Sequence, residues 1–481
     1  MNSPETHARA EQQEIDASTK WPVLVFFFQA MAWLVIGGAL QLLSAIQLHT
    51  PSFLAGCEWF TYGRLSAVAQ NAFIYGWGFN SGLAVALWLM ARLSAAALRH
   101  GGWLIVACKV WNLAVAVGLC GILLGGTTSF ELLEMPRVVS LAMLVAYALM
   151  GVWAITTFSV RNTENVYASQ WYIFGAILWF PWLYAVAQTM LFGTPTHGVV
   201  QAITNAWYVN GIYGLWFTPL AIAAAYYFLP KITGKPIHDY YLATIGFWWL
   251  VITSAFAGGS RLIGGPVPSW VATLGAVANF MLVVAVIIIL KNFLGTLRGN
   301  FGALKNSITL KFIVVSIAGF ALASVMNFAL STRSFAMTTQ FTLIPELRDW
   351  LIVYACFSTA MFGAAYFIVP RVLGVAWQSS VLVGAHFWAS LVGIIVLVVG
   401  LGYGGWQQGQ LLNGDAPFSA ITAALKPWLM LRSIALMVLV IGHFAFVLNF
   451  VWTAWGALTR SGVPATFRPA PAIAAVEGHR A

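Results

Sequence analysis

The chain has 481 residues, of which 60% are hydrophobic and only 7% are charged. Soluble globular domains carry about 25% charged residues, so this composition excludes a soluble domain and predicts an integral membrane protein. The formal net charge of +10 does not indicate a nucleic-acid partner, because the basic residues are spread over many short connections. The partner that the composition itself predicts is the lipid bilayer.

Twelve stretches meet the requirement of roughly 20 mainly apolar residues for a transmembrane helix. In chain order we expect spans at about 22–48, 66–93, 102–126, 138–160, 170–192, 204–230, 240–258, 269–293, 310–332, 350–371, 378–403 and 429–457. The first residues are polar and lack the apolar core of a signal peptide. The sequence therefore predicts a polar N-terminal tail over 1–20, an all-α twelve-helix membrane domain over 21–458, and a Pro- and Ala-rich tail over 459–481.

Lys and Arg residues are unevenly divided between the two sides of this predicted bundle. Most of them belong to the side that holds both termini, including Arg9, Lys20, Arg92, Lys231 and Arg371. Cytoplasmic loops carry an excess of basic residues. We therefore predict that both tails are cytoplasmic, and the positive net charge is mainly a signal of topology.

Few residues within the predicted spans have the chemistry of an active site. The four cysteines form no CxxC pair, and P-loop, HExxH and GxSxG patterns are absent. Only two histidines, His386 and His443, fall within spans. An intramembrane ionisable residue is a functional candidate by default, but we favour a structural hydrogen bond for each histidine. Lys109, in the third span, is expected either to face the interior as a proton or ion relay or to be a snorkelling or paired residue.

Several stretches, in order along the chain, resemble subunit I of the haem-copper oxidases, and among these the cbb3-type cytochrome c oxidase subunit. They include GRLSAVAQNAFIYGWGFN in the second span, AWYVNGIYGLWFTPLAIAAAYYFLP in the sixth, VPSWVATLGAVANFMLVV in the eighth, FGAAYFIVP in the tenth and GAHFWASLVG in the eleventh. The resemblance implies a twelve-helix fold in the bacterial inner membrane, two haems and one copper ion. It also implies partner subunits of a respiratory membrane complex, among them c-type cytochromes.

The histidines that hold these cofactors in the family have no counterpart in this chain. The haem-ligand positions implied by the resemblance are occupied by Ala69, Arg348 and Trp350. The copper-ligand positions are occupied by Asn210, Ser260 and Arg261, and a family tyrosine is replaced by Ser254. Haem iron is held by His, Cys, Met or Tyr, copper at such a site needs imidazole, and a guanidinium stays protonated and repels a cation. We therefore predict no catalytic residue, no bound haem, no copper and no oxygen-reducing activity.

Three classes of function remain. The first, which we favour, is a non-catalytic scaffold subunit of a respiratory or redox complex. The second is a proton or ion conduit that reuses the bundle, with polar candidates Lys109, Asn210, Arg64 and Arg261. The third is an active terminal oxidase or nitric oxide reductase with unfamiliar ligands, such as Met326, Tyr213 or His443.

Loss of the cofactors also predicts local structure. An unpaired buried charge is expensive, so we expect Arg348 or Arg261 to pair with Glu346, Asp349 or a backbone carbonyl. Large empty cavities cost stability. We therefore expect bulky side chains to fill the vacated volume, with Trp350, Trp248 and Trp249 as candidates.

Overall fold

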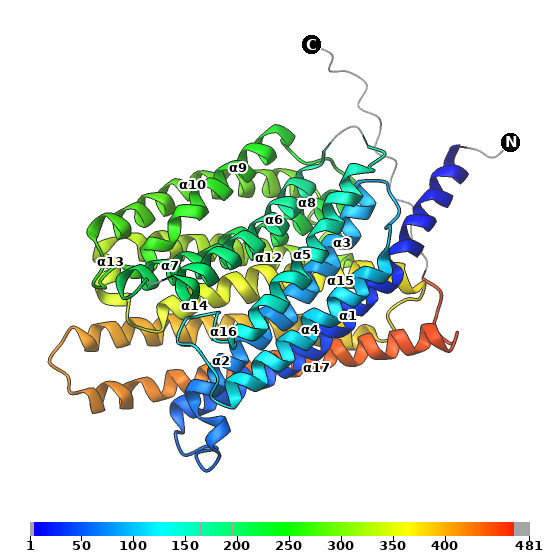
Figure 1. The fold of residues 1–481 in the computed structure, drawn as a ribbon. Coiled ribbons are helices and arrows are strands. Elements are labelled where there is room, and N and C mark those ends of the chain that lie inside the picture. Colours follow the sequence, from blue (N-terminus) through cyan, green and yellow to red (C-terminus); the bar gives the residue numbers. More distant parts are fainter. Residues whose placement is uncertain (1–3, 164–165, 195, 466–481) are drawn as a thin grey trace.

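The computed structural model describes residues 4–163, 166–194 and 196–465, and within these ranges it contains helices but no named strand (Figure 1). Twelve helical segments are long and apolar enough to cross a membrane, which confirms the predicted fold class. They cover Gln13–His49, Tyr62–Leu93, Gly101–Leu123, Arg137–Ser159, Ala168–Gly193, Val199–Thr233, Tyr240–Leu262, Ser269–Leu297, Ile308–Ser331, Ile344–Leu373, Ser380–Leu412 and Phe418–Leu458.

Several spans combine α-helix with a shorter helical segment of different geometry. The α-helices are α1 (Pro4–His49), α2 (Tyr62–Asn71), α3 (Phe79–Leu93), α4 (Gly101–Leu123), α5 (Arg137–Ser159), α6 (Ala168–Gln188), α7 (Val199–Gly211), α8 (Thr218–Thr233), α9 (Tyr240–Phe256), α10 (Ser269–Leu297), α11 (Ala303–Asn306), α12 (Ile308–Ser331), α13 (Arg333–Thr339), α14 (Ile344–Trp350), α15 (Thr359–Leu373), α16 (Ser380–Leu412) and α17 (Phe418–Leu458). The π-helical segments are η2 (Ala72–Gly78), η3 (Thr189–Gly193), η4 (Ile212–Phe217) and η6 (Leu351–Ser358), and the 3₁₀ segments are η1 (Glu58–Phe60) and η5 (Ala257–Leu262).

The long helices lie side by side, and the two termini of the described helical bundle, the start of α1 and the end of α17, lie at the same end (Figure 1). Helices α16 and α17 contain 33 and 41 residues, which corresponds to roughly 50 and 60 Å at 1.5 Å per residue. The hydrocarbon core of a bilayer is only about 30 Å thick. The α16–α17 hairpin accordingly projects beyond the other helices at the end opposite to the termini (Figure 1).

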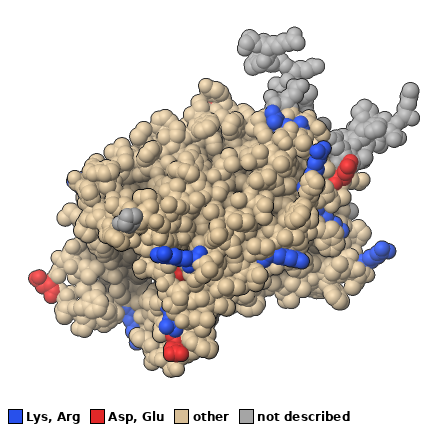
Figure 2. Space-filling model, viewed as in Figure 1, with Lys and Arg blue, Asp and Glu red and all other residues tan. Residues whose placement is uncertain are grey.

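The face of the molecule shown in Figure 2 is largely uncharged. Most of the face in view carries neither Lys, Arg, Asp nor Glu, and several basic side chains lie at the end where both termini are found. The segment expected to be a separate N-terminal tail is instead helical from Pro4 and continuous with the first span. Asp16 anchors that extension through an ion pair with Arg92, with 2.5 Å between Oδ2 and Nη2.

At the other end of the chain, the backbone of residues 463–465 pairs with the loop that follows α15. The amide of Ala376 donates to the carbonyl of Val463, and the amide of Ala465 donates to the carbonyl of Gly374. The remainder of the predicted Pro- and Ala-rich tail, residues 466–481, lies outside the described residues.

Three of the π-helical segments, η2, η4 and η6, lie in spans two, six and ten. They begin one to three residues after Ala69, Asn210 and Trp350, which are positions where the resemblance implies cofactor ligands. Such segments insert an extra residue into the helical turn and frequently mark functional sites. The irregular helix geometry is therefore present at these positions even though the ligand residues are not.

Aromatic side chains fill much of the interior beside these segments. Phe79 and Trp216 stack with 3.9 Å between ring centroids and 9° between ring planes, and Trp77 stacks on Phe362 with centroids 5.0 Å apart. The prediction that Trp248 helps to fill the vacated volume was wrong, because its side chain is half exposed on the outer surface. A helix in lipid can turn a large apolar ring outward at no cost in solvation.

The other two tryptophans lie partly inside the protein. The indole of Trp249 donates to the carbonyl of Met281 at 2.6 Å. Trp350 contacts both Phe73 and Tyr354, with ring centroids 6.1 Å apart in each case. Trp350 is therefore the candidate that contributes to the packing between spans two and ten.

The glycine-rich break after α9 lets two backbones approach each other. A Cβ atom on Gly275 of α10 would lie 2.1 Å from the amide nitrogen of Ser260, and one on Gly259 of η5 would lie 2.2 Å from the carbonyl oxygen of Val271. Real Cβ atoms essentially never come so close to backbone atoms. The contact between η5 and α10 therefore requires glycine at both positions, and it fixes the segment that carries Arg261.

We predict that Gly275→Ala destabilises the protein by roughly 1–3 kcal/mol, because backbone rather than a flexible side chain must move. The measurement is the thermal unfolding temperature of the detergent-purified chain. Gly102→Ala is the matched control, because Gly102 is exposed and has no atom within 4 Å of an added Cβ. Equal unfolding temperatures for the two variants would contradict the close approach.

Candidate functional site: an ion-pair cluster beside a polar cavity

Asp349 lies between two buried arginines. Its Oδ2 is 2.8 Å from Nη2 of Arg261 and its Oδ1 is 3.1 Å from Nη1, so the carboxylate and the guanidinium form a two-pronged pair. Nε of Arg348 donates to the same Oδ1 at 2.9 Å. Glu131 adds a weaker contact, with Oε1 3.6 Å from Nη2 of Arg261. The predicted pairing of Arg348 and Arg261 with Asp349 is confirmed.

The residues of this cluster come from three separate parts of the chain. Arg261 lies at the end of η5, Arg348 and Asp349 lie in α14, and Glu131 lies in the connection between α4 and α5. The backbone of Arg261 is held as well, because the amide of Gln340 donates to its carbonyl at 2.6 Å. The backbone that carries Arg261 is thus held by a contact that does not depend on the charge of its side chain.

A second ion pair lies nearby, between Arg432 of α17 and Glu346 of α14. Nη2 of Arg432 contacts Oε1 of Glu346, and the indole of Trp350 donates to the same oxygen at 3.2 Å. Arg432 is only 6% exposed. Its Nε and Nη1 are buried and have no hydrogen-bond partner among the described residues. A buried charged donor without a partner is costly, so this arginine stands out as an incompletely satisfied group.

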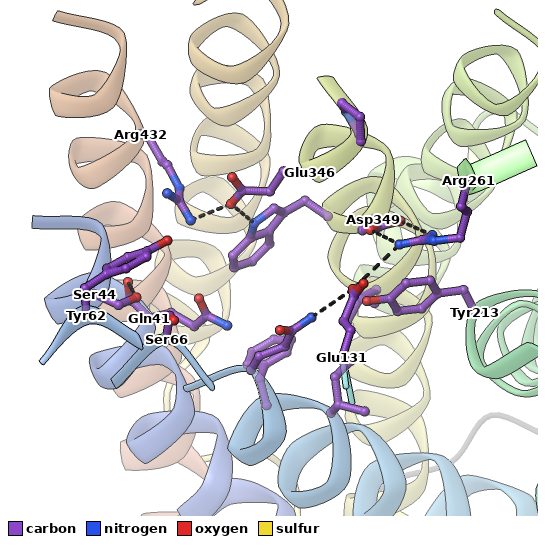
Figure 3. A pocket seen from close by; sticks show the side chains of 16 residues that line it. Gln41, Ser44, Tyr62, Ser66, Glu131, Tyr213, Arg261, Glu346, Asp349 and Arg432 are labelled. Carbon is purple, nitrogen blue, oxygen red and sulfur yellow. Dashed lines mark hydrogen bonds and ion pairs between the residues drawn. The ribbon is translucent and has the colours of Figure 1, made fainter. Parts of the chain in front are cut away.

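A cavity of about 380 Å³ separates the two ion pairs (Figure 3). Sixteen residues line it: Gln41, Ser44, Tyr62, Ser66, Gln70, Phe73, Ile74, Glu131, Tyr213, Arg261, Pro345, Glu346, Asp349, Trp350, Val353 and Arg432. They belong to α1, α2, η2, η4, η5, α14, η6, α17 and the connection after α4. Cavities of about 300–1,000 Å³ with a few convergent polar groups are the usual form of small-molecule sites.

The connection between α4 and α5 folds inward over this region. Glu134 is buried and accepts a hydrogen bond from the amide of Asn71 at 2.7 Å. The phenol of Tyr75 donates to the carbonyl of Leu132 at 2.5 Å and lies 2.6 Å from the phenol of Tyr208. Burial raises the pKa of the Glu134 carboxyl to about 7, against the opposing effect of the Asn71 amide.

The two intramembrane histidines lie on facing helices, and each has a tyrosine partner. Nδ1 of His386 is 2.9 Å from the phenol of Tyr366, and Nε2 of His443 is 2.7 Å from the phenol of Tyr354. The structural hydrogen bond expected for each is confirmed. The second nitrogen of each ring is buried without a hydrogen-bond partner in the described part of the chain, and Phe362 packs against both rings.

The remaining positions singled out by the resemblance are either packed or bonded to the protein. Ala69 is fully buried. The amide of Asn210 donates to the carbonyl of Ser254 at 2.9 Å. The hydroxyl of Ser260 accepts from the amide of Asn279 at 2.8 Å. None of these three side chains carries an imidazole nitrogen that could bind a metal ion.

Two further polar candidates lie away from the cluster. Lys109 is exposed on the outer face of α4, as are Val106 and Leu113, so the expectation that it faces the interior as a relay was wrong and its alternative role as a snorkelling or paired residue remains. Periodicity did not decide between these faces because α4 is apolar on both. Arg64 joins two segments, since its Nη1 donates to the carbonyls of Glu58 and Leu123 at 3.0 and 3.1 Å.

Several lining residues were not singled out as site residues from the sequence. Glu131, Tyr62 and Gln70 looked like ordinary loop or helix-end residues. Arg432 was not singled out either, although it falls inside the predicted twelfth span. A charge within an apolar segment is costly and faces the bundle interior or a water-filled cavity, and this signal would have identified Arg432.

The residues at the former ligand positions do not fit the cofactors. A copper ion beside Arg261 and Arg348 would meet two protonated guanidinium groups and no imidazole. No group of three or more His, Cys, Asp or Glu residues with metal-binding geometry occurs in the described ranges. The cavity lined by Asn210, Ser254 and Arg348 measures about 30 Å³, which is space for one or two water molecules and not for a haem.

The twelve-helix arrangement defines the class of protein as a membrane protein with the fold of haem-copper oxidases. The structure of a haem-copper terminal oxidase, determined as a dimer, superposes with a TM-score of 0.73 at 14% sequence identity, covering 92% of this chain and 84% of that one. The sequence profile of the family described as "Cytochrome C and Quinol oxidase polypeptide I" matches residues 22–438. The chain therefore belongs to that family.

Curated bacterial relatives cover nearly the whole chain. Cytochrome c oxidase subunit 1 of Rhodobacter capsulatus is 26% identical over 448 residues, which is 87% of this chain and 82% of that protein. The cbb3-type cytochrome c oxidase subunit CcoN1 of Stutzerimonas stutzeri is 24% identical over 465 residues, or 93% and 97%. A cytochrome c oxidase subunit 1 homologue of Azorhizobium caulinodans is 24% identical over 477 residues, or 94% and 85%. These relatives and the twelve spans fit a multi-pass protein of the bacterial inner membrane.

We predict that Asp349→Asn destabilises the protein by roughly 3–5 kcal/mol, because it leaves Arg348 without its ion-pair partner and Arg261 with only the weaker contact to Glu131. The measurement is the unfolding temperature and the yield of folded protein in detergent. Asp415→Asn, at an exposed position between α16 and α17, is the control and should change stability by no more than about 0.5 kcal/mol. The double variant Arg261→Met, Asp349→Leu removes one positive and one negative charge and should recover part of the loss. Equal behaviour of Asp349→Asn and Asp415→Asn would show that the cluster does not stabilise the fold.

We also predict that Glu134 makes stability depend on pH. Its pKa rises from 4.5 to about 7 on folding, so the unfolded chain loses this proton first. Stability therefore falls as pH increases from about 4.5 to about 7, by up to roughly 3 kcal/mol, and then becomes constant. Glu134→Gln, which keeps the amide partner and cannot ionise, should remove this component from a plot of unfolding temperature against pH. Identical pH profiles for the variant and the parent would exclude the effect.

Proposed function

We propose that this chain is a haem-free and copper-free subunit of a membrane-bound redox complex, to which it contributes structure and contact surface rather than oxygen chemistry. The observation that carries the proposal is the cluster of Arg261, Asp349 and Arg348. Arg261 and Arg348 stand where the resemblance implies a copper histidine and a haem histidine. The first guanidinium pairs with Asp349 through two hydrogen bonds and the second through one.

Electrostatics supports this reading. The side chains of Arg261 and Arg348 are 12% and 7% exposed, so water screens their charges poorly. A copper ion would add a third positive charge to a group that one aspartate and the more distant Glu131 already balance. Binding the metal would require breaking the ion pairs. Both desolvated guanidinium groups would then lose the contacts that compensate for their burial.

The names of the relatives support the role of a subunit. The proteins from Rhodobacter capsulatus and Stutzerimonas stutzeri are named as subunits of cytochrome c oxidases. In this chain Lys109 lies on an otherwise apolar outer face of α4 without a hydrogen-bond or ion-pair partner in the described residues. A helix of a neighbouring subunit that carries an acidic or hydrogen-bonding group would satisfy it. We expect partner subunits in the membrane, with c-type cytochromes among the candidates.

The alternative of a proton or ion conduit has less support. Its four polar candidates do not line one path, because Lys109 faces outward and Arg64 binds two backbone carbonyls. Asn210 bonds to the backbone of α9, and Arg261 is fixed by Asp349. An active oxidase has less support still, because Tyr213 lies under the guanidinium of Arg261 and His443 is bonded to Tyr354.

The proposal predicts that the purified full-length chain contains no stoichiometric haem or copper and that it co-purifies with a membrane partner. A pyridine-haemochrome spectrum and metal analysis measure the first, with the Stutzerimonas stutzeri relative purified in parallel as the cofactor-containing control. Quantitative mass spectrometry of the tagged chain from native membranes measures the second.

The two measurements test different parts of the proposal. Stoichiometric haem or copper would overturn the ligand argument, and His443→Ala and Tyr354→Phe would then show whether those side chains hold the cofactor. A cofactor-free chain that occurs alone at native expression levels would instead overturn the subunit role. Lys109→Leu is the variant for the outer face, and it should reduce partner recovery without changing the unfolding temperature of the isolated chain.

A further inference from the structure

A purely structural function of the chain makes no use of the cavity between the two ion pairs. We propose that it binds a small zwitterion, an organic molecule with a carboxylate at one end and an ammonium group at the other. At about 380 Å³, the cavity lies within the range of small-molecule sites. It is lined by polar groups at both ends and by apolar side chains between them (Figure 3).

One end of the cavity offers hydrogen-bond donors to an anion. Arg432 is 6% exposed, and only its Nη2 is engaged, by Glu346. Nε and Nη1 lack partners among the described residues and are themselves buried, so a carboxylate reaches them only when the guanidinium turns toward the cavity. The hydroxyl group of Tyr62 points into the same end of the cavity (Figure 3), whereas the hydroxyl of Ser44 already donates to the carbonyl of Gln41. A carboxylate matches the planar fork of a guanidinium in a two-pronged geometry, and it would satisfy donors that are costly to leave unmade.

The opposite end exposes negative charge. The side chain of Glu131 is 40% exposed, whereas that of Arg261 is 12% exposed and already paired with Asp349. Gln70 and Arg261 approach Oε1 of Glu131, and no hydrogen bond to the described residues engages its Oε2. The accessible charge at this end is therefore a carboxylate, which an ammonium group complements.

The wall between the two ends is aromatic and apolar. Trp350 and Phe73 lie with their ring centroids 6.1 Å apart, and Ile74 and Val353 also line the cavity. This surface suits a short methylene chain, which loses contact with water on binding. The ligand that fits all three parts is a short amino acid whose two charges are separated by such a chain.

The balance of charge favours a zwitterion over a simple ion. The charged lining residues are two arginines and three acids: Arg261, Arg432, Glu131, Glu346 and Asp349. Arg348, which bonds to Asp349 from behind, makes the group neutral as a whole. A simple anion or cation would disturb that balance in a partly enclosed site, whereas a zwitterion carries no net charge. The headgroup of phosphatidylethanolamine combines an anionic oxygen group with an ammonium group in the same way and is a second source of this chemistry.

The experiment measures binding to the purified full-length chain by thermal unfolding and isothermal calorimetry. The soluble probes are glycine, 4-aminobutanoate and 6-aminohexanoate, and butanoate and butylamine are the single-charge controls. We expect at least one amino acid to bind saturably and at least tenfold more tightly than either single-charge control. The proposal is overturned if no amino acid binds, or if butanoate or butylamine binds equally well, unless the lipid test gives a positive result.

The lipid test repeats the measurement in nanodiscs of phosphatidylethanolamine and of phosphatidylcholine. Weaker amino-acid binding in phosphatidylethanolamine alone would show that the headgroup occupies the cavity. The same affinity in both lipids would identify a soluble ligand. If the amino acids bind in neither lipid and phosphatidylethanolamine gives no stabilisation over phosphatidylcholine, the zwitterion site does not exist.

Variants connect binding to the cavity. Glu131→Gln should weaken binding at the ammonium end at least tenfold. The double variant Arg432→Gln, Glu346→Gln removes the other ion pair without leaving an unpaired charge and should do the same. Tyr62→Phe, which removes a single hydroxyl, serves if the double variant does not fold. Glu58→Gln, exposed and outside the cavity, is the matched control and should bind like the parent. Unchanged affinity in Glu131→Gln and in either variant of the carboxylate end would place any binding elsewhere.

Discussion

The pairing of Asp349 with two buried arginines is the constraint on which this region depends. Desolvating a guanidinium costs several kcal/mol unless a counter-charge and hydrogen bonds replace the lost water. Asp349 gives Arg261 a counter-charge and accepts two hydrogen bonds from it, and it accepts a third hydrogen bond from Arg348. Because Arg261 follows α9 and Asp349 lies in α14, the pair joins spans seven and ten. The ion pair therefore links two helices that are about 90 residues apart in the sequence.

The helix geometry around the cluster is supported by contacts within the protein. The π-helical segments η2, η4 and η6 are stabilised by side chains on the protein itself, such as the indole of Trp77, which donates to the hydroxyl of Ser358 at 2.9 Å. Glycines allow close contact beside them: a Cβ on Gly78 would meet the ring of Phe217 at 2.7 Å. A fold of this kind tolerates exchange of its ligand residues as long as the aromatic packing and these backbone contacts remain. Family membership and retention of the reaction are accordingly separate properties.

The sequence allowed the twelve spans to be predicted because each is a long apolar run. Because buried charges need partners, it also predicted that Arg348 or Arg261 would pair with Glu346, Asp349 or a backbone carbonyl, but it did not say which of these partners would be used. It did not predict which face of a helix points inward where both faces are apolar, as Lys109 and Trp248 show. In lipid the outer face is as hydrophobic as the core, so the periodicity that orients helices in soluble proteins is weak. The cavity was not predictable either, since Glu131 and Arg432 are about 300 residues apart and only the tertiary fold brings them to opposite ends of one space.

The same cluster also determines whether the polar interior is a passage or a recess. Arg261 and Tyr213 line both the 380 Å³ cavity and the smaller one of about 30 Å³ behind it. The guanidinium lies over the Tyr213 ring, with 5.5 Å from Cζ to the ring centroid, while Asp349 holds it through two hydrogen bonds. An ion that passed between the cavities at this guanidinium would have to break its ion pair in surroundings of low dielectric constant, where such pairs are strong. In this conformation the wall formed by Arg261 and Tyr213 therefore separates the two cavities, which favours a binding recess over a conduit.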